Sequence, residues 1–427
     1  MVISRENIEY LKKFAEEEME TYDFSGVISV IKNDAVIYET CRGYASLEFG
    51  IPNTIDTKFS IASVSKQFTA FAVMLLYDRK LLSIDASAAD YLPDGLDLPK
   101  DISIHHLLSH TSGLYNIYNF EDDFYIGENR LPYDKKAFFD KWVMKKPRKE
   151  AGKEFEYNNT NYHLLAWIIE HVSGQSFGEF LRSNIFIPLG MVNTGFDDGM
   201  AVIPGKAQNY MRDFGKQVRV PYENLMFHMG AGGMYSSCRD LQIWYKALRD
   251  RKLLSQQTYD RYFTQNEAHY CYGLEHFTGD GMDFFVHGGD ANGVSTLLIH
   301  NFKEDQCIII LSNTESLSQY RLSKDITDIL SGKRPEHPKK PEEVRVDEKF
   351  LQRFSGTYLP GKISMEIKNG KLYLVRENQN IHIELYYTGN NTFIRRFEEQ
   401  NSPYVLLEEG KTRPSIWGCE LKTELNG

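Results

Sequence analysis

Short runs dominated by apolar and β-branched residues predict strands near the start of the chain and again near residue 300. The runs "GVISVI" (26–31) and "AVIYETC" (35–41) flank turn residues at 32–34, which is typical of a hairpin. Three further runs are "DFFVHGG" (283–289), "VSTLLIHN" (294–301) and "QCIIILSN" (306–313). We therefore expect one sheet assembled from N-terminal and later segments.

A spacing of three to four residues between apolar positions predicts helices around and between these strands. An amphipathic helix is expected at the N-terminus, where Ile8, Leu11, Phe14 and Ala15 share one face. The other expected helices are "SVSKQFTAFAVMLLYDRK" (63–80), "SIHHLLSHTSGL" (103–114), "NYHLLAWIIEHVSG" (161–174), "SSCRDLQIWYKALRDRKLL" (236–254) and "SLSQYRLSKDITDIL" (316–330). Helices inserted between the strands predict an α/β domain, an antiparallel sheet flanked by helices with a mostly helical subdomain.

A proline-rich charged segment, residues 332–345, separates this region from a tail of short β-rich runs and turns. The tail predicts a small all-β barrel or sandwich. The expected division is a catalytic domain at 1–331, a linker at 332–345 and a barrel at 346–427. Trp417 and the pair Tyr386 and Tyr387 are interpreted as core residues of the barrel.

Composition narrows the class of protein. Of the 427 residues, 42% are hydrophobic and 25% are charged, as in soluble globular proteins. The formal net charge of −10 argues against a nucleic-acid partner. The charged N-terminus carries no apolar leader and no run of 18 or more apolar residues occurs, so we expect a cytoplasmic protein. An exported chain whose leader has been removed would look the same.

A serine followed three residues later by a lysine occurs twice, at Ser63/Lys66 and at Ser29/Lys32. Ser29 and Lys32 lie in an expected strand, where positions three apart point to opposite faces. Ser63 and Lys66 begin an expected helix, where such positions share a face and Lys66 can reach the Ser63 hydroxyl. Because a serine needs a neighbouring base to act as a nucleophile, only the second pair predicts an active site, and we expect no Ser-His-Asp elbow.

Two later segments complete a candidate site. Tyr157-Asn158-Asn159 precedes a helix, and His287-Gly288-Gly289 ends an expected strand. Tyr-x-Asn also occurs at residues 222–224, so that motif alone is weak. The ordered set of three motifs is the specific feature.

With these motifs in place, the chain resembles the serine β-lactamase-like superfamily. The resemblance rests on "FSIASVSKQFTA", "HHLLSHTSGL", "FEYNNTNYHLLAWIIEHVSG", "GAGGMYSSCRDL" and "FFVHGGDANGVST", and it covers about residues 5–330. The superfamily includes class C β-lactamases, low-molecular-weight penicillin-binding proteins, D-Ala-D-Ala carboxypeptidases, D-aminopeptidases and esterases. The tail resembles the lipocalin-like domains attached to some members.

The resemblance implies a role for each motif. Ser63 would be the acylated nucleophile, Lys66 and Tyr157 would share the base role, and Asn159 would orient Lys66 and the substrate. His287, Gly288 and Gly289 would line the substrate site. The oxyanion hole would consist of the backbone N–H groups of Ser63 and Asp290. A free lysine titrates near ~10.4 and a free tyrosine near ~10, so either base needs a depressed pKa.

His287 and Gly288 depart from the Lys-Thr-Gly or Lys-Ser-Gly of many members. A histidine with a pKa near ~6.5 is largely neutral at pH 7, and Gly288 lacks the hydroxyl. Both changes predict weaker recognition of a carboxylate and easier acceptance of neutral esters and amides.

The sequence indicates a serine hydrolase that forms an acyl-enzyme on Ser63. The expected substrates are small molecules or peptides, above all D-amino-acid peptides and related amides or esters, with slow acylation by β-lactams. The alternative is a non-hydrolytic penicillin-binding or sensor protein that uses the same pocket. We expect no cofactor and no metal: His106 and His110 share a helical face but lack a third ligand. Residues 115–128 form either a lid over the site or an ordinary surface loop, and the oligomeric state stays open.

Overall fold

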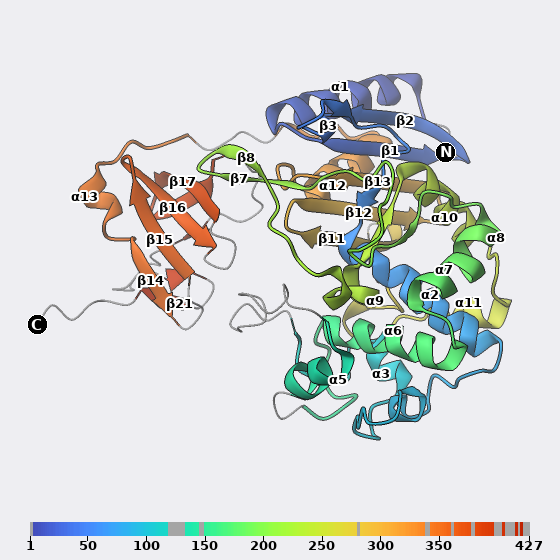
Figure 1. The fold of residues 1–427 in the computed structure, drawn as a ribbon. Helices are drawn as coiled ribbons and strands as arrows, with labels where there is room; N and C mark the ends of the chain where they lie inside the picture. The colour runs from blue at the N-terminus through green and yellow to red at the C-terminus, as the bar shows by residue number, and fades with distance from the viewer. Residues whose placement is uncertain are drawn as a thin grey trace, which may run out of the picture.

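The structure, a computed structural model, has an antiparallel six-stranded sheet at its centre (Figure 1). It describes residues 3–117, 133–144, 149–279, 282–337, 342–359, 363–376, 381–396, 404–405, 415–416 and 419–421. In order across the sheet, the strands are β10 (Glu275–Gly279), β11 (Met282–Ala291), β12 (Val294–Asn301), β13 (Gln306–Ser312), β1 (Gly26–Lys32) and β2 (Ala35–Arg42). The predicted assembly from two distant segments is confirmed.

The β1–β2 hairpin turns at Asn33 and Asp34, which adopt φ angles of 50° and 61°. Asparagine and aspartate tolerate this left-handed region better than most residues. Strand β1 is buried along its whole length, and its alternating side chains serve two separate cores. Val27 and Ile31 face one layer of helices, whereas Ile28 and Val30 face the other.

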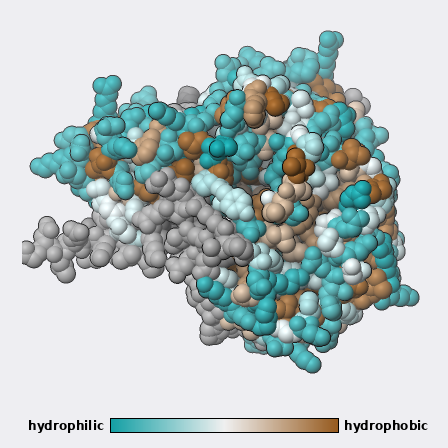
Figure 2. Space-filling view, in the orientation of Figure 1, coloured by the Kyte–Doolittle hydropathy of each residue, from teal (hydrophilic) through white to brown (hydrophobic). Residues whose placement is uncertain are grey.

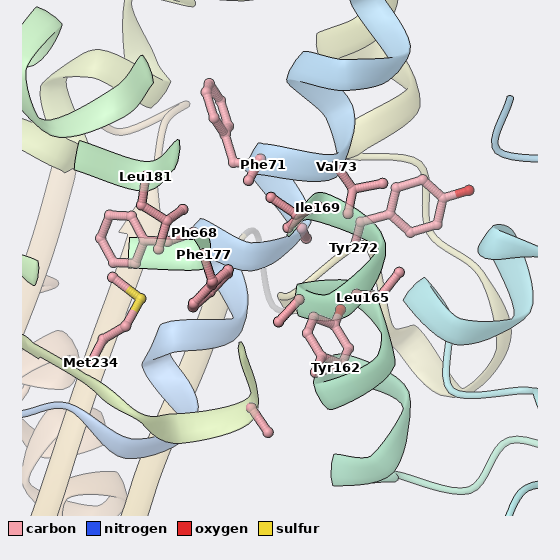
Figure 3. Close-up of a cluster of buried hydrophobic side chains, with 14 of the residues drawn as sticks. Phe68, Phe71, Val73, Tyr162, Leu165, Ile169, Phe177, Leu181, Met234 and Tyr272 are labelled. Atoms are coloured by element: carbon pink, nitrogen blue, oxygen red, sulfur yellow. The ribbon is translucent and has the colours of Figure 1, made fainter. Parts of the chain in front are cut away.

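One face of the sheet is covered by α1 (Arg5–Thr21) and α12 (Gln319–Leu330). The larger helical layer covers the other face and contains α2 (Ser65–Asp78), α3 (Ile104–Leu108), α5 (Lys135–Phe138), α6 (Asn159–Ser173), α7 (Phe177–Leu181), α8 (Ile187–Leu189), α9 (Met229–Gly232), α10 (Cys238–Arg249) and α11 (Gln256–Tyr262). Figure 3 shows its centre, where Phe68 and Phe71 of α2 and Leu165 and Ile169 of α6 belong to one buried hydrophobic cluster. Among the described residues, no helix is both long enough and apolar enough to cross a bilayer.

The helix predicted over 103–114 is too long. Helix α3 ends at Leu108, and His110 adopts a φ of 59°, which a continuing right-handed helix does not allow. By contrast, α6 ends as expected, with Gly174 in the left-handed conformation at its C-cap.

The C-terminal region contains an eight-stranded antiparallel sheet. Its order is β19 (Tyr404–Val405), β18 (Thr392–Arg395), β17 (Ile381–Gly389), β16 (Lys371–Arg376), β15 (Ile363–Lys368), β14 (Gly356–Leu359), β21 (Cys419–Leu421) and β20 (Ser415–Ile416). The edge strands β19 and β20 are not paired with each other in the described residues, so a closed barrel is not confirmed. Tyr386 is buried and Tyr387 packs against the core of this sheet, whereas Trp417 lies outside the described residues.

A hairpin from the larger region joins the two sheets. Strands β7 (Tyr210–Asp213) and β8 (Lys216–Arg219) reach toward β17, as Figure 1 shows. The Phe214 ring stacks on His382 with the centroids 4.0 Å apart, and the His382 N–H donates to Asp213 at 2.8 Å. In the space-filling view, the C-terminal sheet lies beside the larger body (Figure 2). The remaining short strands are β3 (Tyr44–Ser46), β4 (Ile51–Pro52), β5 (Phe59–Ser60), β6 (Gly195–Phe196) and β9 (Met234–Ser236).

Candidate active site

Ser63 lies in a single 3-10 turn, Ala62–Val64, that leads directly into α2. The preceding Ala62 adopts a φ of 42°, a conformation that residues with a side chain rarely take. Such strain persists only where the surrounding structure enforces it, and it is typical of functional turns. The positive end of the helix dipole favours negative charge developing on the Ser63 oxygen.

Lys66 is fully buried, and its Nζ atom has three hydrogen-bond acceptors within reach. They are Ser63 Oγ at 3.1 Å, Asn159 Oδ1 at 2.8 Å and the main-chain oxygen of Ala231 at 2.7 Å. None of the three is a carboxylate. Burial therefore lowers the pKa of Lys66 well below its ordinary value, because no negative charge offsets the loss of hydration.

Tyr157 lies over this lysine, with Lys66 Nζ 4.8 Å from the centre of its ring. Burial raises the pKa of the Tyr157 phenol well above its ordinary value, and the contact with Ser63 acts in the opposite direction. The sequence-based expectation that either group needs a depressed pKa is thus met in direction by Lys66 and not by Tyr157. Tyr157 is in the protonated form at neutral pH, which suits a proton donor.

The turn that carries Tyr157 is supported by residues to which the sequence analysis assigned no such role. Asn158 caps α6, and its backbone N–H donates to His110 Nδ1 at 3.0 Å. The His110 ring packs 4.5 Å from the Tyr157 ring. Asn116 Nδ2 donates to the Tyr157 carbonyl oxygen, and Asn116 Oδ1 accepts from the Asn159 N–H, each at 3.3 Å. His110 adopts an unusual φ angle of 59°, and the spacing of apolar residues does not predict such a backbone conformation.

His287 is buried on β11, and its two ring nitrogens already have neighbours. Nδ1 lies 2.6 Å from the Gly288 carbonyl oxygen, and Nε2 lies 3.3 Å from the Tyr270 hydroxyl. Burial, and then the charge of Lys66, lower the pKa of His287 to about 3. The imidazole is therefore neutral at pH 7 and supplies no cation to the site.

Gly289 brings β11 against the nucleophile turn. A Cβ atom at this position would lie 2.3 Å from the Ile61 oxygen and 3.1 Å from the Ser63 nitrogen, so only glycine fits. Buried Thr296 bridges the same two segments, since its hydroxyl lies 3.1 Å from the Ile61 oxygen and 3.0 Å from the Gly289 oxygen. This close approach holds the end of β11 beside the Ser63 N–H.

Beyond Gly289, a pocket of about 310 Å³ opens at the end of β11 and the start of α12. Asp290, Glu315, Gln319 and Tyr320 line it, together with Arg395 from the C-terminal sheet. Although the Asp290 side chain reaches solvent, the surrounding protein raises its pKa to about 6, and the charge of Glu315 adds to the increase. Gln319 Nε2 donates to Asp290 at 2.8 Å and opposes this shift.

The second Ser-x-x-Lys pair lies away from the site. Ser29 Oγ accepts from Gln242, whereas Lys32 Nζ, on the opposite face of β1, donates to the Glu304 carbonyl oxygen at 2.6 Å. The separation of the two faces therefore agrees with the strand argument.

Other motifs have structural explanations. Tyr222 of the second Tyr-x-Asn is exposed. The expectation that no G-x-S-x-G elbow motif occurs is wrong, since residues 174–178 match it. Its Ser176 is an exposed N-cap of α7 that follows helix α6 rather than a strand, so it does not form a nucleophile elbow. His106 closes a capping box with Ser103, and it does not share a helix with His110, contrary to the prediction. Most of the segment 115–128 lies outside the described residues, so the choice between lid and loop stays a prediction.

Comparison with known proteins agrees with this arrangement. The family profile described as Beta-lactamase matches residues 11–332. Penicillin-binding protein 4* of Bacillus subtilis (strain 168) is 26% identical over an alignment of 455 positions, gaps included, which covers 95% of this chain and 98% of that protein. The similarity to this relative therefore extends beyond the matched family region into the tail.

Solved structures show the same fold. A penicillin-binding protein from Bacillus halodurans superposes with a TM-score of 0.64 at 26% identity, covering 74% of this chain and 99% of that one. A D-amino acid amidase from Ochrobactrum anthropi superposes with a TM-score of 0.65 at 22% identity, covering 77% and 100%. On the extent of the profile match, the chain belongs to the beta-lactamase family.

Proposed function

We propose that this protein is a serine hydrolase that acts through an acyl-enzyme on Ser63. One observation carries the proposal: a fully buried lysine amine lies 3.1 Å from the Ser63 hydroxyl and contacts only uncharged acceptors. In this setting the amine is a base that can take the serine proton, which a solvated ammonium cannot do.

Acylation follows from the directions of the two pKa shifts. Neutral Lys66 accepts the Ser63 proton while the Ser63 oxygen bonds to the substrate carbonyl carbon. As the tetrahedral intermediate collapses, the bond to the leaving group breaks, and Tyr157 donates a proton to the departing nitrogen or oxygen. The proton on Lys66 then returns to Tyr157, so the free site is restored apart from the acyl group. In deacylation, neutral Lys66 accepts a proton from a water molecule while the water oxygen bonds to the acyl carbon. The bond from this carbon to the Ser63 oxygen then breaks, the Ser63 oxygen takes the proton from Lys66, and the acid is released.

The oxyanion hole is assigned to the backbone N–H groups of Ser63 and Asp290. The support is the close approach at Gly289, which places the end of β11 within contact of the Ser63 nitrogen. Such fixed donors are often the largest single contribution to acyl transfer.

The proposed substrates are D-amino-acid peptides and related amides or esters. Among the described strands, β10 pairs with β11 only as far as Val286, so the edge at residues 287–291 is open on that side. An extended peptide backbone can add to such an edge as another strand. Neutral His287 and the absence of a side-chain hydroxyl at Gly288 favour neutral substrates over a free carboxylate. The D-amino acid amidase among the structural neighbours supports the same substrate class.

The alternative function is that of a binding protein that becomes acylated on Ser63 but does not hydrolyse the acyl-enzyme. The names of two relatives, both penicillin-binding proteins, favour this alternative.

We further propose that residues 1–331 are the catalytic domain and residues 346–427 a lipocalin-like domain. Its eight-stranded antiparallel sheet supports this division.

Time-resolved intact-protein mass spectrometry with fluorescent penicillin and with p-nitrophenyl esters separates the two functions. A hydrolase forms an adduct on Ser63 that later disappears, and it releases several moles of product per mole of protein. An adduct that accumulates to one equivalent and never decays, with every ester and D-peptide tested, contradicts hydrolysis and supports the binder.

A further inference from the structure

The space that a side chain at Gly288 would need is occupied by Tyr320. A Cβ atom on Gly288 would lie 1.9 Å from the Tyr320 hydroxyl oxygen and 2.6 Å from its ring carbon Cζ. Tyr320 belongs to the first turn of α12, which covers the sheet from its other face. The Tyr320 hydroxyl therefore lies close to the place where a threonine or serine side chain at residue 288 would be, although it belongs to α12 and not to β11.

This hydroxyl is available to a ligand. The Tyr320 side chain is 46% exposed, and its oxygen has no hydrogen-bond partner in the part of the chain that the structure describes. Partial burial, and then the charges of Asp290 and Glu275, raise the pKa of the phenol. The group consequently keeps its proton and can act as a donor.

The position of Tyr320 relates it to the reacting atoms. Its hydroxyl lies where a Cβ atom on Gly288 would stand, next to His287, whose ring centre is 6.0 Å from that of Tyr157. Gly288 lies between buried His287 and Gly289, which touches the Ser63 turn. The hydroxyl thus lies against β11 just beyond Val286, where the pairing with β10 ends, and Tyr320 also lines the 310 Å³ pocket.

The charges around this point disfavour an anion. Two carboxylates, Asp290 and Glu315, line the pocket against a single guanidinium, Arg395. His287 offers no positive charge. A neutral donor beside net negative charge suits an uncharged acceptor better than a carboxylate.

We propose that Tyr320 is a specificity-determining residue whose hydroxyl donates a hydrogen bond to a neutral acceptor on the leaving-group side of the substrate. It thereby favours amides and esters over substrates that carry a free carboxylate at that place. This inference rests on the proposed acyl-transfer function and narrows its substrate class.

The test compares N-acetyl-D-Ala-D-Ala amide with N-acetyl-D-Ala-D-Ala, which differ only in the charge of the leaving group. Tyr320→Phe should lower kcat/KM for the amide about tenfold and reduce the preference for amide over acid. Fluorophosphonate labelling of Ser63, which uses no such leaving group, should stay within about twofold of wild type. Tyr44→Phe, at a tyrosine of β3 that is also 46% exposed, is the matched control and should change neither rate.

A relocation experiment tests the geometry directly. Tyr320→Ala removes the hydroxyl and opens the space, and adding Gly288→Ser supplies a hydroxyl from the strand itself. The double variant should recover several-fold of the amide activity that Tyr320→Ala loses. Failure of this recovery, or a Tyr320→Phe enzyme as active and selective as wild type, overturns the inference. A wild-type protein that is not labelled at Ser63 refutes instead the acyl-transfer function on which it rests.

Discussion

The amine of Lys66 lies 2.8 Å from the side-chain oxygen of Asn159, a neutral acceptor at a position where a carboxylate would hold the lysine charged. The other two acceptors around Nζ, Ser63 Oγ and the Ala231 carbonyl oxygen, are also neutral. Desolvation therefore decides the protonation of this lysine, and most of the predicted chemistry depends on it.

Replacing Lys66 by methionine should abolish activity while replacing Lys32 should not. Lys66→Met keeps the length of the side chain but removes the base, so kcat/KM should fall by about three orders of magnitude or more. Lys32→Met removes the other Ser-x-x-Lys lysine, which bonds to Glu304 on the opposite side of the sheet. Steady-state kinetics with a p-nitrophenyl ester measure both. Equal activities of the two variants would contradict the assignment of the base.

Asn159→Asp should move the pH dependence of the reaction. In the wild type, kcat/KM should rise with pH through a pKa well below 10.5, because only the neutral amine accepts a proton. A carboxylate at 159 favours the ammonium form, raises the pKa of Lys66 and shifts this rising limb to higher pH. The pH profile of kcat/KM reports the free enzyme. A limb that stays in place or moves to lower pH would argue against Lys66 as the group that titrates.

Gly289→Ala should damage catalysis through geometry. The new Cβ would lie 2.3 Å from the Ile61 oxygen, so the end of β11 must move away from the Ser63 turn. A shift of this size should cost about a hundredfold in kcat. Gly279→Ala is the matched control, because a Cβ there meets nothing within 4 Å. Kinetics of both variants, with melting curves to confirm folding, decide the point; an unimpaired Gly289→Ala enzyme would exclude this oxyanion geometry.

Acid should destabilise the fold through buried histidines. Burial lowers the pKa of His163, His287 and His300 to about 3 in each case. In the unfolded chain these groups titrate near ~6.5, so between these values the unfolded state binds more protons than the folded state. The contribution of these histidines to the free energy of unfolding is therefore fully present above pH 6.5. Below that pH it decreases, by up to about 1.4 kcal/mol per pH unit for each histidine.

Urea unfolding at pH 7.5 and pH 5.0 measures this slope. His163→Gln should reduce the change in the free energy of unfolding with pH by the amount that corresponds to the uptake of about one proton. The reason is that this substitution removes one of the histidines that stay neutral in the folded protein. A His163→Gln protein with the wild-type slope would show that His163 does not contribute.

Much of the geometry of the candidate site was predictable because its signals are local. The contrast between Ser29/Lys32 and Ser63/Lys66 needed only the difference between strand and helix periodicity. The sheet strands were likewise found from runs of apolar residues, and the C-cap at Gly174 from its residue type.

The unpredicted features join residues far apart in the chain. Nothing in the local sequence indicates that Thr296 bridges Ile61 and Gly289, or that Tyr320 fills the space beside Gly288. The predicted helix 103–114 was too long because apolar spacing does not report a backbone reversal at His110. A closed barrel could not be derived either, since pairing of the edge strands depends on register rather than on composition.

The most direct test of the account maps the covalent adduct left by a fluorophosphonate probe. Peptide mapping after labelling should place the adduct on Ser63 in the wild type. It should also find the adduct retained in Ser29→Ala and lost in Ser63→Ala. Labelling that persists in Ser63→Ala, or an adduct on any other serine of the wild-type chain, would contradict the central claim that Ser63 is the nucleophile.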